Sequence, residues 1–537
     1  MPPDLWYKDA IFYQVYLRAF KDSNGDGHGD IQGLTSKLDY LQDLGIDCIW
    51  LMPIYQSPLR DDGYDIADFY SIADIFGTLD DFRGLLQAAH DRGIRLIMDL
   101  VMNHTSDQHP WFRAARLDRK SPYRDYYVWS DTDERYKEAR IIFVDVEPSN
   151  WAWDGEAGQF YWHRFYASQP DLNYDNPRVQ EEMLNVARFW LDIGVDGFRA
   201  DAVPYLFERE GTNCENLPET HAFLKRLRAM MDEDYPGRIL LCEANQPPEE
   251  VREYFGDGDE FHMGFHFPIM PRLFMALKKG RSEDLRNILM RTPPIPMKCQ
   301  WCTFLRNHDE LTLEMVTPEE RQWMWENYAP DRRMRLNLGI RRRLAPLVDG
   351  DIRKIRLINS LLLTLPGSPI IYYGDEIGMG DNIWLADRNG VRTPMQWTAG
   401  DTAGFSSAAA PLLYSPVIEG SYGPQRVSVD AEQQDPSSLW HAIRHMLHTR
   451  KGHRAFGWGD LEWLDSENDR IAAFWRHFED ERVLAVHNLA ASDETLLVTA
   501  RPAAPLRDLL TGERYELGPA HPEIRLAPYE FLWLKAA

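Results

Sequence analysis

The sequence contains no apolar run long enough to cross a membrane. Its longest apolar stretch, residues 361–365, ends at Pro366-Gly367, far short of the ~20 residues that a transmembrane helix needs. Residues 1–20 lack the continuous apolar core of a secretory signal peptide, because charged residues interrupt them at four positions. We therefore expect no membrane partner and a cytoplasmic location.

The sequence also has few cysteines and a negative net charge. Five cysteines in 537 residues do not suggest a disulfide framework, and Cys299 and Cys302 have no second pair with which to complete a zinc site. We expect reduced, buried thiols. The net charge of −25 argues against a nucleic-acid partner, because phosphate binding needs clustered Lys and Arg. A homo-oligomer remains possible.

What is present is a globular composition with alternating strand and helix patterns. Amphipathic segments such as 34–44 and 79–92 end at Gly45 and Gly93, where a helix C-cap belongs. Between such segments lie short apolar runs at 11–16, 48–51, 95–100, 197–200, 239–242, 303–305 and 369–373. This alternation predicts parallel βαβ units. A (β/α)₈ TIM barrel is favoured over a doubly wound sheet, partly because no GxGxxG sequence follows an early strand.

The spacing of the units is uneven and predicts additional parts. Aromatic and polar stretches interrupt the barrel pattern after the third, seventh and eighth strands, on the face that carries active sites in such barrels. Together they could roof a pocket. The predicted division is a barrel over 1–104 and 176–454, an inserted subdomain over 105–175, a further insertion over 310–350, and a C-terminal antiparallel β-sandwich domain over 455–537.

Acidic and basic residues end several predicted strands. Arg199 and Asp201 end the fourth strand and share a face, since side chains alternate along a strand. Glu243 ends the fifth strand, and Asp309 follows the seventh. One such carboxylate is often a helix N-cap, but three that converge at one barrel end indicate function. Two carboxylates are the minimum apparatus for glycosidic bond chemistry, and Arg199 would keep Asp201 ionised as a nucleophile.

These residues lie in recognisable motifs. Residues 99–104, 197–201, Glu243 and 307–309 resemble the four signature regions of the α-amylase superfamily, and residues 169–173 resemble the fifth region of its oligo-1,6-glucosidase branch. The resemblance implies that Asp201 is the nucleophile, Glu243 the general acid/base and Asp309 the transition-state stabiliser. It also implies a glucose subsite made by Asp61, Tyr64, His104, Gln169, Arg199, His308 and Arg392.

A finer resemblance concerns the outer segments. Residues 262–271, 337–344 and 373–382 are similar to the maltose–trehalose isomerases of this superfamily. The implied reaction converts the α-1,4 link of maltose to the α,α-1,1 link of trehalose through a covalent glucosyl-enzyme, with minor hydrolysis. The alternatives are an α-glucosidase or oligo-1,6-glucosidase, a sucrose isomerase, and a non-catalytic relative, which the three retained acids disfavour. Pro247 stands where the family usually has Trp, close to the acid/base.

A structural metal is also expected, and no organic cofactor. Oxygen-bearing residues alternate along 22–30, with Gly27 at the sixth position, as a tight Ca²⁺ loop requires; a metal-free Asx-rich turn would look the same. The candidate ligands are Asp22, Asn24, Asp26, His28 and Asp30. The family resemblance supports Ca²⁺ here. It implies a second Ca²⁺ site formed by Asn103, Asp171 and Glu208 with the backbone carbonyls of Tyr205 and Leu206.

Overall fold

The structure is a computed structural model that describes residues 3–464, 466–498, 505–516 and 523–536. Parts of the predicted C-terminal domain, 455–537, and the first two residues of the predicted barrel therefore lie outside the described residues. Among the described residues, no helix is both long and apolar enough to span a bilayer.

Eight parallel strands close into a barrel in the order β1-β16-β12-β11-β10-β9-β5-β2, which confirms the predicted fold. They are β1 (Phe12–Val15), β2 (Cys48–Leu51), β5 (Arg95–Val101), β9 (Gly197–Asp201), β10 (Ile239–Cys242), β11 (Met263–Phe265), β12 (Gln300–Phe304) and β16 (Ser368–Tyr372). Nearly every residue of these strands is buried, as expected where helices cover one face and the barrel interior fills the other. The sequence pattern missed β11, which is three residues long.

Helices surround the barrel, and several of them end at a glycine in the left-handed conformation. The main ones are α3 (Leu38–Leu44), α4 (Leu79–Asp91), α6 (Pro177–Ile193), α7 (Pro218–Asp234), α9 (Ile269–Lys279), α10 (Glu283–Arg291), α13 (Ile352–Thr364) and α15 (Leu439–Lys451). At the end of α3, Gly45 has a φ of 104° and its N–H donates to the carbonyls of Gln42 and Leu41. A left-handed residue after the last turn is the usual way to satisfy these carbonyls.

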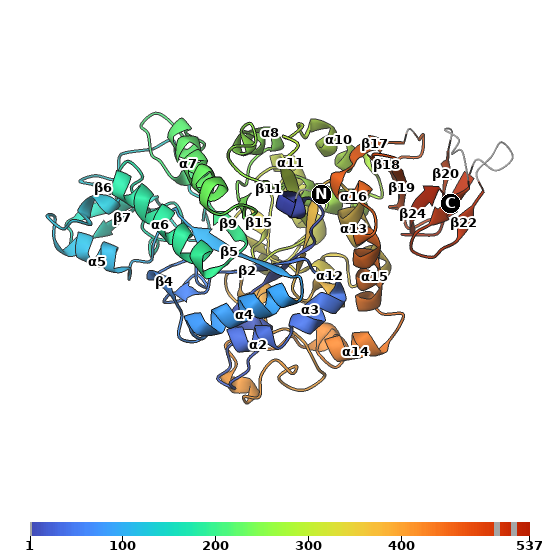
Figure 1. Ribbon diagram of the computed structural model, residues 1–537, viewed down its shortest axis with the longest axis horizontal. Helices are drawn as coiled ribbons and strands as arrows, with labels where there is room; N and C mark the ends of the chain where they lie inside the picture. Colours follow the sequence, from blue (N-terminus) through green and yellow to red (C-terminus); the bar gives the residue numbers. More distant parts are fainter. Residues whose placement is uncertain (1–2, 465, 499–504, 517–522, 537) are drawn as a thin grey trace.

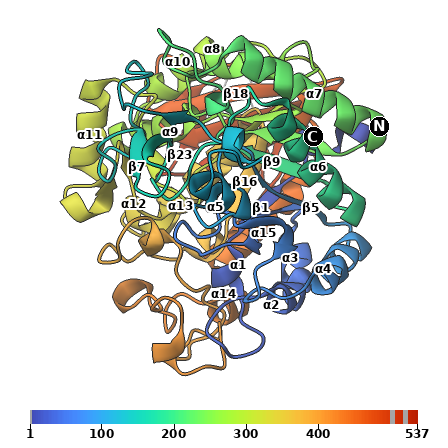
Figure 2. The ribbon, with the colours of Figure 1, turned by 90° about the vertical axis from the view of Figure 1, so that its left-hand side faces the viewer.

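Two insertions lie over the carboxyl ends of the strands. Between β5 and α6, helix α5 (Pro110–Leu117) and the antiparallel strands β6 (Trp129–Ser130), β7 (Trp151–Asp154) and β8 (Gln159–Trp162) form a small subdomain, here called subdomain B. Between β12 and α13, helix α11 (Pro318–Tyr328) accompanies the short strands β13 (Leu311–Thr312), β14 (Arg335–Leu336) and β15 (Gly339–Ile340). We call residues 310–350 the β12 insertion. Figure 2 shows subdomain B in front of the barrel strands.

The chain ends in an antiparallel domain on the opposite side of the barrel from subdomain B (Figure 1). One sheet contains β17 (Asp460–Trp463), β18 (Ile471–Phe478), β19 (Glu481–Asn488), β24 (Phe531–Ala536), β21 (Leu506–Asp508) and β22 (Arg514–Tyr515), and a second pairs β20 (Glu494–Leu497) with β23 (Glu523–Leu526). Leu484 and Leu534 of the first sheet share one apolar cluster with Leu496 and Ile524 of the second. This facing arrangement is the predicted β-sandwich.

Candidate active site

Arg199 lies at the centre of the site and contacts three carboxylates. Its Nη1 donates to Asp201 Oδ1 at 2.5 Å and also contacts Asp99, while its Nη2 contacts Glu243. Asp99 comes from β5, Arg199 and Asp201 from β9, and Glu243 follows β10, so three neighbouring strands supply the group. The sequence analysis named all of these except Asp99 as site residues.

The environment separates the protonation states of the two catalytic candidates. Burial raises the pKa of Asp201 to about 6, and Arg199 opposes the rise. Burial also raises the pKa of Glu243 to about 8, with Arg199 again opposing it and the charges of Asp201 and Asp309 adding to it. At neutral pH, Asp201 is mainly ionised and Glu243 mainly protonated. A nucleophile and a general acid need these states.

Asp309 faces the same pocket from the loop after β12. It accepts hydrogen bonds from Arg388 Nη1 at 2.8 Å and Arg392 Nη2 at 2.9 Å, and His308 Nε2 lies 3.1 Å from its Oδ2. Although burial opposes the shift, His308 and the two guanidinium groups hold the pKa of Asp309 below its usual range. Asp309 therefore remains an anion, as stabilisation of a developing positive charge requires.

His308 is fixed by two side chains from other loops and strands. Gln14 Nε2 of β1 donates to His308 Nδ1 at 2.6 Å, and Tyr64 Oη lies 2.8 Å from Nε2. The two rings of Tyr64 and His308 stack at a centroid distance of 5.5 Å. The bond from Gln14 leaves the ring proton on Nε2, which faces Tyr64 Oη and Asp309 Oδ2. Gln14 was missed; its signal in the sequence is one polar residue within an apolar strand.

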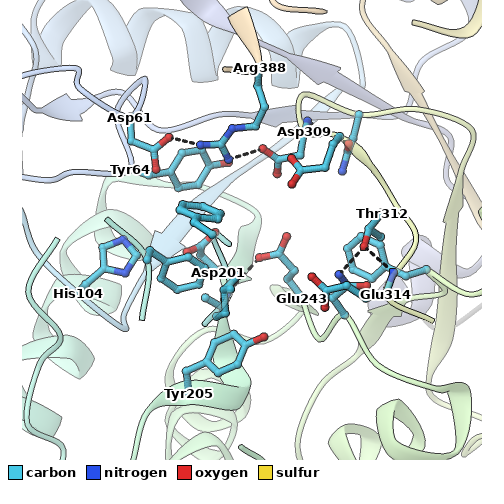
Figure 3. A pocket seen from close by; sticks show the side chains of 18 residues that line it. Asp61, Tyr64, His104, Asp201, Tyr205, Glu243, Asp309, Thr312, Glu314 and Arg388 are labelled. Atoms are coloured by element: carbon cyan, nitrogen blue, oxygen red, sulfur yellow. Dashed lines mark hydrogen bonds and ion pairs between the residues drawn. The ribbon is translucent and has the colours of Figure 1, made fainter. Parts of the chain in front are cut away.

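The predicted subsite residues separate into a pocket wall and a layer behind it. Asp61, Tyr64, His104, Asp201, Glu243 and Asp309 line one pocket (Figure 3). Gln169, Arg199, His308 and Arg392 lie behind them and hold them in place; Gln169 Nε2, for example, donates to Asp61 Oδ2 at 2.9 Å. His104 Nε2 has no protein partner among the described residues and is free to bind a sugar hydroxyl.

Arg388 is the cation at the pocket wall, and the sequence analysis did not name it. Arg388 Nη2 donates to Asp61 Oδ1 at 2.6 Å while Nη1 binds Asp309, so one guanidinium joins two wall carboxylates. Arg392 is instead buried beneath the wall, where its Nε donates to the carbonyl of His308 and its Nη1 to Asp62. Phe143, Phe267 and Glu310 also line the pocket and were missed, and Phe165 lines it from the predicted inserted subdomain.

A cluster around Arg140 lies at one side of the pocket. Arg140 belongs to subdomain B, and its guanidinium donates to Glu314 at 2.8 Å, Glu215 at 2.9 Å and the hydroxyl of Tyr205 at 3.1 Å. Glu314 belongs to the β12 insertion, and Glu314 and Tyr205 line the pocket. Arg140 thus joins three loops over the site, which agrees with the predicted roof.

Further contacts join subdomain B to the β12 insertion and to the loop after β16. Asp145 of subdomain B binds Arg332 at 3.1 Å and accepts from the backbone N–H of Asn337 at 2.8 Å, both in the β12 insertion. Tyr166 Oη donates to Asp387, in the loop after β16, at 3.2 Å.

Pro247 lies outside the pocket wall and precedes the short helix α8 (Pro248–Val251). The wall position beyond Glu243 belongs to Asn245.

The loop predicted to bind Ca²⁺ is a series of Asx turns. Asp22 Oδ1 accepts from the N–H groups of Asn24 and Gly25, Asp26 Oδ1 from that of His28, and Asp30 Oδ2 from that of Ser23. The His28 ring does not offer its Nδ1 to a metal ion in the loop, because this atom accepts a hydrogen bond from Arg18 Nε at 3.1 Å. A His28 ligand would therefore be its backbone carbonyl.

The second predicted metal set has oxygens without partners. Asn103 Oδ1, Asp171 Oδ2 and Glu208 Oε1 are buried and have no hydrogen-bond partner among the described residues. Burial raises the pKa of Asp171 to about 8 and that of Glu208 well above its usual range. Within the described ranges no three His, Cys, Asp or Glu side chains gather as a metal site, and this holds for residues 22–30 as well. The second set has two carboxylates and one amide. Buried oxygens without donors are what a hard cation would bind.

Comparison with known protein families agrees with the fold and the site described above. The family model for the alpha amylase catalytic domain matches residues 14–459. The chain belongs to the α-amylase family. The family model for the maltogenic amylase C-terminal domain matches residues 461–533, the region of the β-sandwich.

Similar proteins include enzymes with named activities. The chain is 60% identical over 499 residues to the trehalose synthase/amylase TreS of Mycobacterium tuberculosis, covering 91% of this chain and 83% of that protein. It is 56% identical over 499 residues to the trehalose synthase of a Pimelobacter species, covering 90% of this chain and 87% of that one. Among solved structures, the α-glucosyl transfer enzyme XgtA matches with a TM-score of 0.82 at 30% identity over 99% of both chains.

The pKa values of Asp201 and Glu243 predict a bell-shaped pH dependence of kcat/KM. Asp201 must be ionised to attack, so activity should fall as the pH decreases through about 6. Glu243 must be protonated to donate, so activity should also fall as the pH rises through about 8. Initial rates with maltose across this range measure both limbs.

The variant Glu243→Gln tests whether Glu243 produces the alkaline limb of the pH profile and another group, Asp201, the acidic limb. With α-glucosyl fluoride, whose leaving group needs no proton, Glu243→Gln should lose the alkaline limb and keep the acidic one. An unchanged alkaline limb in that variant would show that another group sets it.

Proposed function

We propose that this protein is a maltose–trehalose isomerase, that is, a trehalose synthase, which acts by a retaining double displacement. The observation that carries the proposal is the combination of a paired nucleophile and acid with a roof joined by Arg140. Relatives at 60% and 56% identity over most of the chain are named trehalose synthase. The motifs of the catalytic centre alone do not separate an isomerase from a hydrolase, so the roof is essential to the argument.

The first step breaks the α-1,4 link of maltose. The Asp201 carboxylate would attack the anomeric carbon, and the proton of Glu243 would pass to the leaving oxygen. The products are a β-glucosyl ester on Asp201 and a free glucose. One guanidinium contacts both carboxyl groups, which favours the close pairing of retaining enzymes, ~5–5.5 Å, over the wider gap that an inverting enzyme keeps for water.

The second step re-joins the same two sugars. The released glucose would turn within the closed pocket until its anomeric hydroxyl faces the glucosyl ester. Glu243, now a carboxylate, would take the proton of that hydroxyl, and the new α,α-1,1 bond would release Asp201. Two inversions restore the original configuration. No organic cofactor takes part.

The other side chains act on charge and orientation. Asp309 would stabilise the positive charge that develops on the sugar ring in both transition states. Arg388 holds Asp309 and Asp61 at a fixed separation through one guanidinium. His104 and Tyr64 would bind hydroxyls of the reacting glucose from the pocket wall.

Closure decides whether water or glucose attacks the ester. Arg140 joins subdomain B to Glu314 and Tyr205 at the side of the pocket where the acceptor would lie. Asp145 adds a second contact to the β12 insertion, and Tyr166 joins subdomain B to the loop after β16. Such closure excludes water and retains the glucose that must re-attack. Occasional opening would release glucose, so we infer minor hydrolysis.

We also propose that the protein binds two structural Ca²⁺ ions and resides in the cytoplasm. The first ion would be held by the turns of residues 22–30, the second by Asn103, Asp171 and Glu208. The orphaned oxygens of the second set support its assignment. All five cysteines are free and buried, which supports a reducing compartment.

The function is tested by proton NMR of the purified enzyme with maltose as the sole substrate. Trehalose signals should rise well before free glucose. Asp201→Asn should lower both signals by on the order of 10⁴-fold or more, as the loss of a covalent nucleophile does. Glucose alone, formed at twice the maltose consumed, would instead identify an α-glucosidase.

Weakening the roof should convert isomerisation into hydrolysis. Glu314→Ala removes one partner of Arg140 without touching Asp201 or Glu243, and should raise the ratio of glucose to trehalose several-fold. Glu210→Ala is the matched control, because Arg135 and Glu210 form an exposed pair at the edge of subdomain B, 3.2 Å apart. An equal ratio in both variants would remove the roof from the explanation.

Removal of Ca²⁺ should lower the thermal midpoint. An ion present at 100 times its Kd adds about 2.7 kcal/mol to stability, so chelation followed by calorimetry should show a clear decrease that added Ca²⁺ reverses. Metal analysis should find two ions in the wild type and one in Glu208→Gln. An ion count of zero with an unchanged midpoint would contradict both sites.

A further inference from the structure

A second cavity lies directly behind one wall of the reaction pocket. We call it the side cavity. Its polar lining comprises Arg18, Arg60, Asp62, Asp387, Asn389 and Ser415. Asp61 and Arg388 line the reaction pocket, whereas their chain neighbours Asp62 and Asp387 line the side cavity. The two cavities therefore share a wall. The side cavity measures about 280 Å³ and the reaction pocket about 120 Å³, so a sugar-sized ligand has room.

The charges that line the side cavity are already compensated. Arg18 lies 3.4 Å from Asp62, and Arg60 lies 2.9 Å from Asp107. Asp387 lies 3.3 Å from Arg388. Because Arg18 and Arg60 each lie beside a carboxylate and Asp387 lies beside Arg388, neither an anionic nor a cationic ligand gains a free counter-charge, and either would disturb a balanced set.

One polar group in the lining, the hydroxyl of Ser415, has no hydrogen-bond partner within the part of the chain that the structure describes. Ser415 is 8% exposed. A buried hydroxyl without a partner costs stability unless something binds it. Carboxylates, guanidinium groups and this hydroxyl together offer both acceptors and donors.

The shared wall is also strained. Leu59, Asp62 and Asp387 all line the side cavity, with φ values of 59°, 46° and 49°. Left-handed backbone is costly for residues other than glycine, above all for leucine, and such strain gathers at ligand sites and switches.

From the balanced charge, the size and the unpaired hydroxyl, we propose that the side cavity binds an uncharged polyol of monosaccharide size. Sugar hydroxyls both donate and accept, which matches this mixed lining. The occupant would contact Asp62 and Asp387, whose partners Arg392 and Arg388 both bind Asp309. Binding in the side cavity is thereby connected to the reaction pocket through two ion pairs.

Equilibrium dialysis with radiolabelled glucose tests the proposal without turnover. Because the reaction pocket would accommodate both glucose units of the disaccharide, the side cavity should add one glucose to those bound there. Ser415→Trp should fill the side cavity and bind one glucose fewer per chain than the wild type. Leu412→Trp is the matched control: Leu412 is 65% exposed and lies in the same segment, so this variant should bind as many glucose molecules as the wild type.

Kinetics give an independent reading. Glucose should inhibit the wild type by a mixed pattern and Ser415→Trp by a purely competitive one. If Ser415→Trp does not fold, Asn389→Ala, an exposed rim position, should weaken the second binding event several-fold. Equal glucose binding by the wild type, Ser415→Trp and Asn389→Ala would overturn the proposal. These outcomes do not depend on whether maltose yields trehalose or glucose.

Discussion

The site depends on one buried guanidinium that holds three carboxylates together. Without Arg199, Asp99, Asp201 and Glu243 would be like charges in a place without solvent, and they would repel or take up protons. Lysine could not replace it, because the planar guanidinium presents donors in fixed directions to several acceptors at once. The position of Arg199 is itself set by β9, whose neighbours β5 and β10 bring the other two acids to the same end of the barrel.

The same constraint gives three acids in one pocket three different proton affinities. Burial acts on all of them in the same direction. Asp201 and Glu243 both contact Arg199 and both feel neighbouring carboxylates, and the balance with burial leaves the pKa of Asp201 at about 6 and that of Glu243 at about 8. Asp309 has Arg388 and Arg392 as further partners and is the strongest acid of the three. These three proton affinities fit the proposed roles of nucleophile, proton donor and charge stabiliser.

The sequence predicted the features that depend on local pattern. The barrel, both insertions and the acids at strand ends are visible because strand periodicity and helix ends are local properties. Arg388 was missed although Arg392 was named, since only the 3₁₀ turn at Asn389–Val391 decides which of the two faces the sugar. Gln14 and Arg140 were missed for another reason: their partners lie far away in the chain, and packing alone brings them together.

This difference bears on how isomerases and hydrolases of one family diverge. The residues that perform the chemistry sit at strand ends, where the barrel fixes them, and the motifs there are shared. In the mechanism proposed above, contacts such as that between Arg140 and Glu314, which lie 174 residues apart, decide whether glucose or water attacks the glucosyl ester. Each such contact at a partly exposed surface is weak by itself. Several are therefore needed to hold the roof, and Arg140, Asp145 and Tyr166 supply them between subdomain B and three other loops.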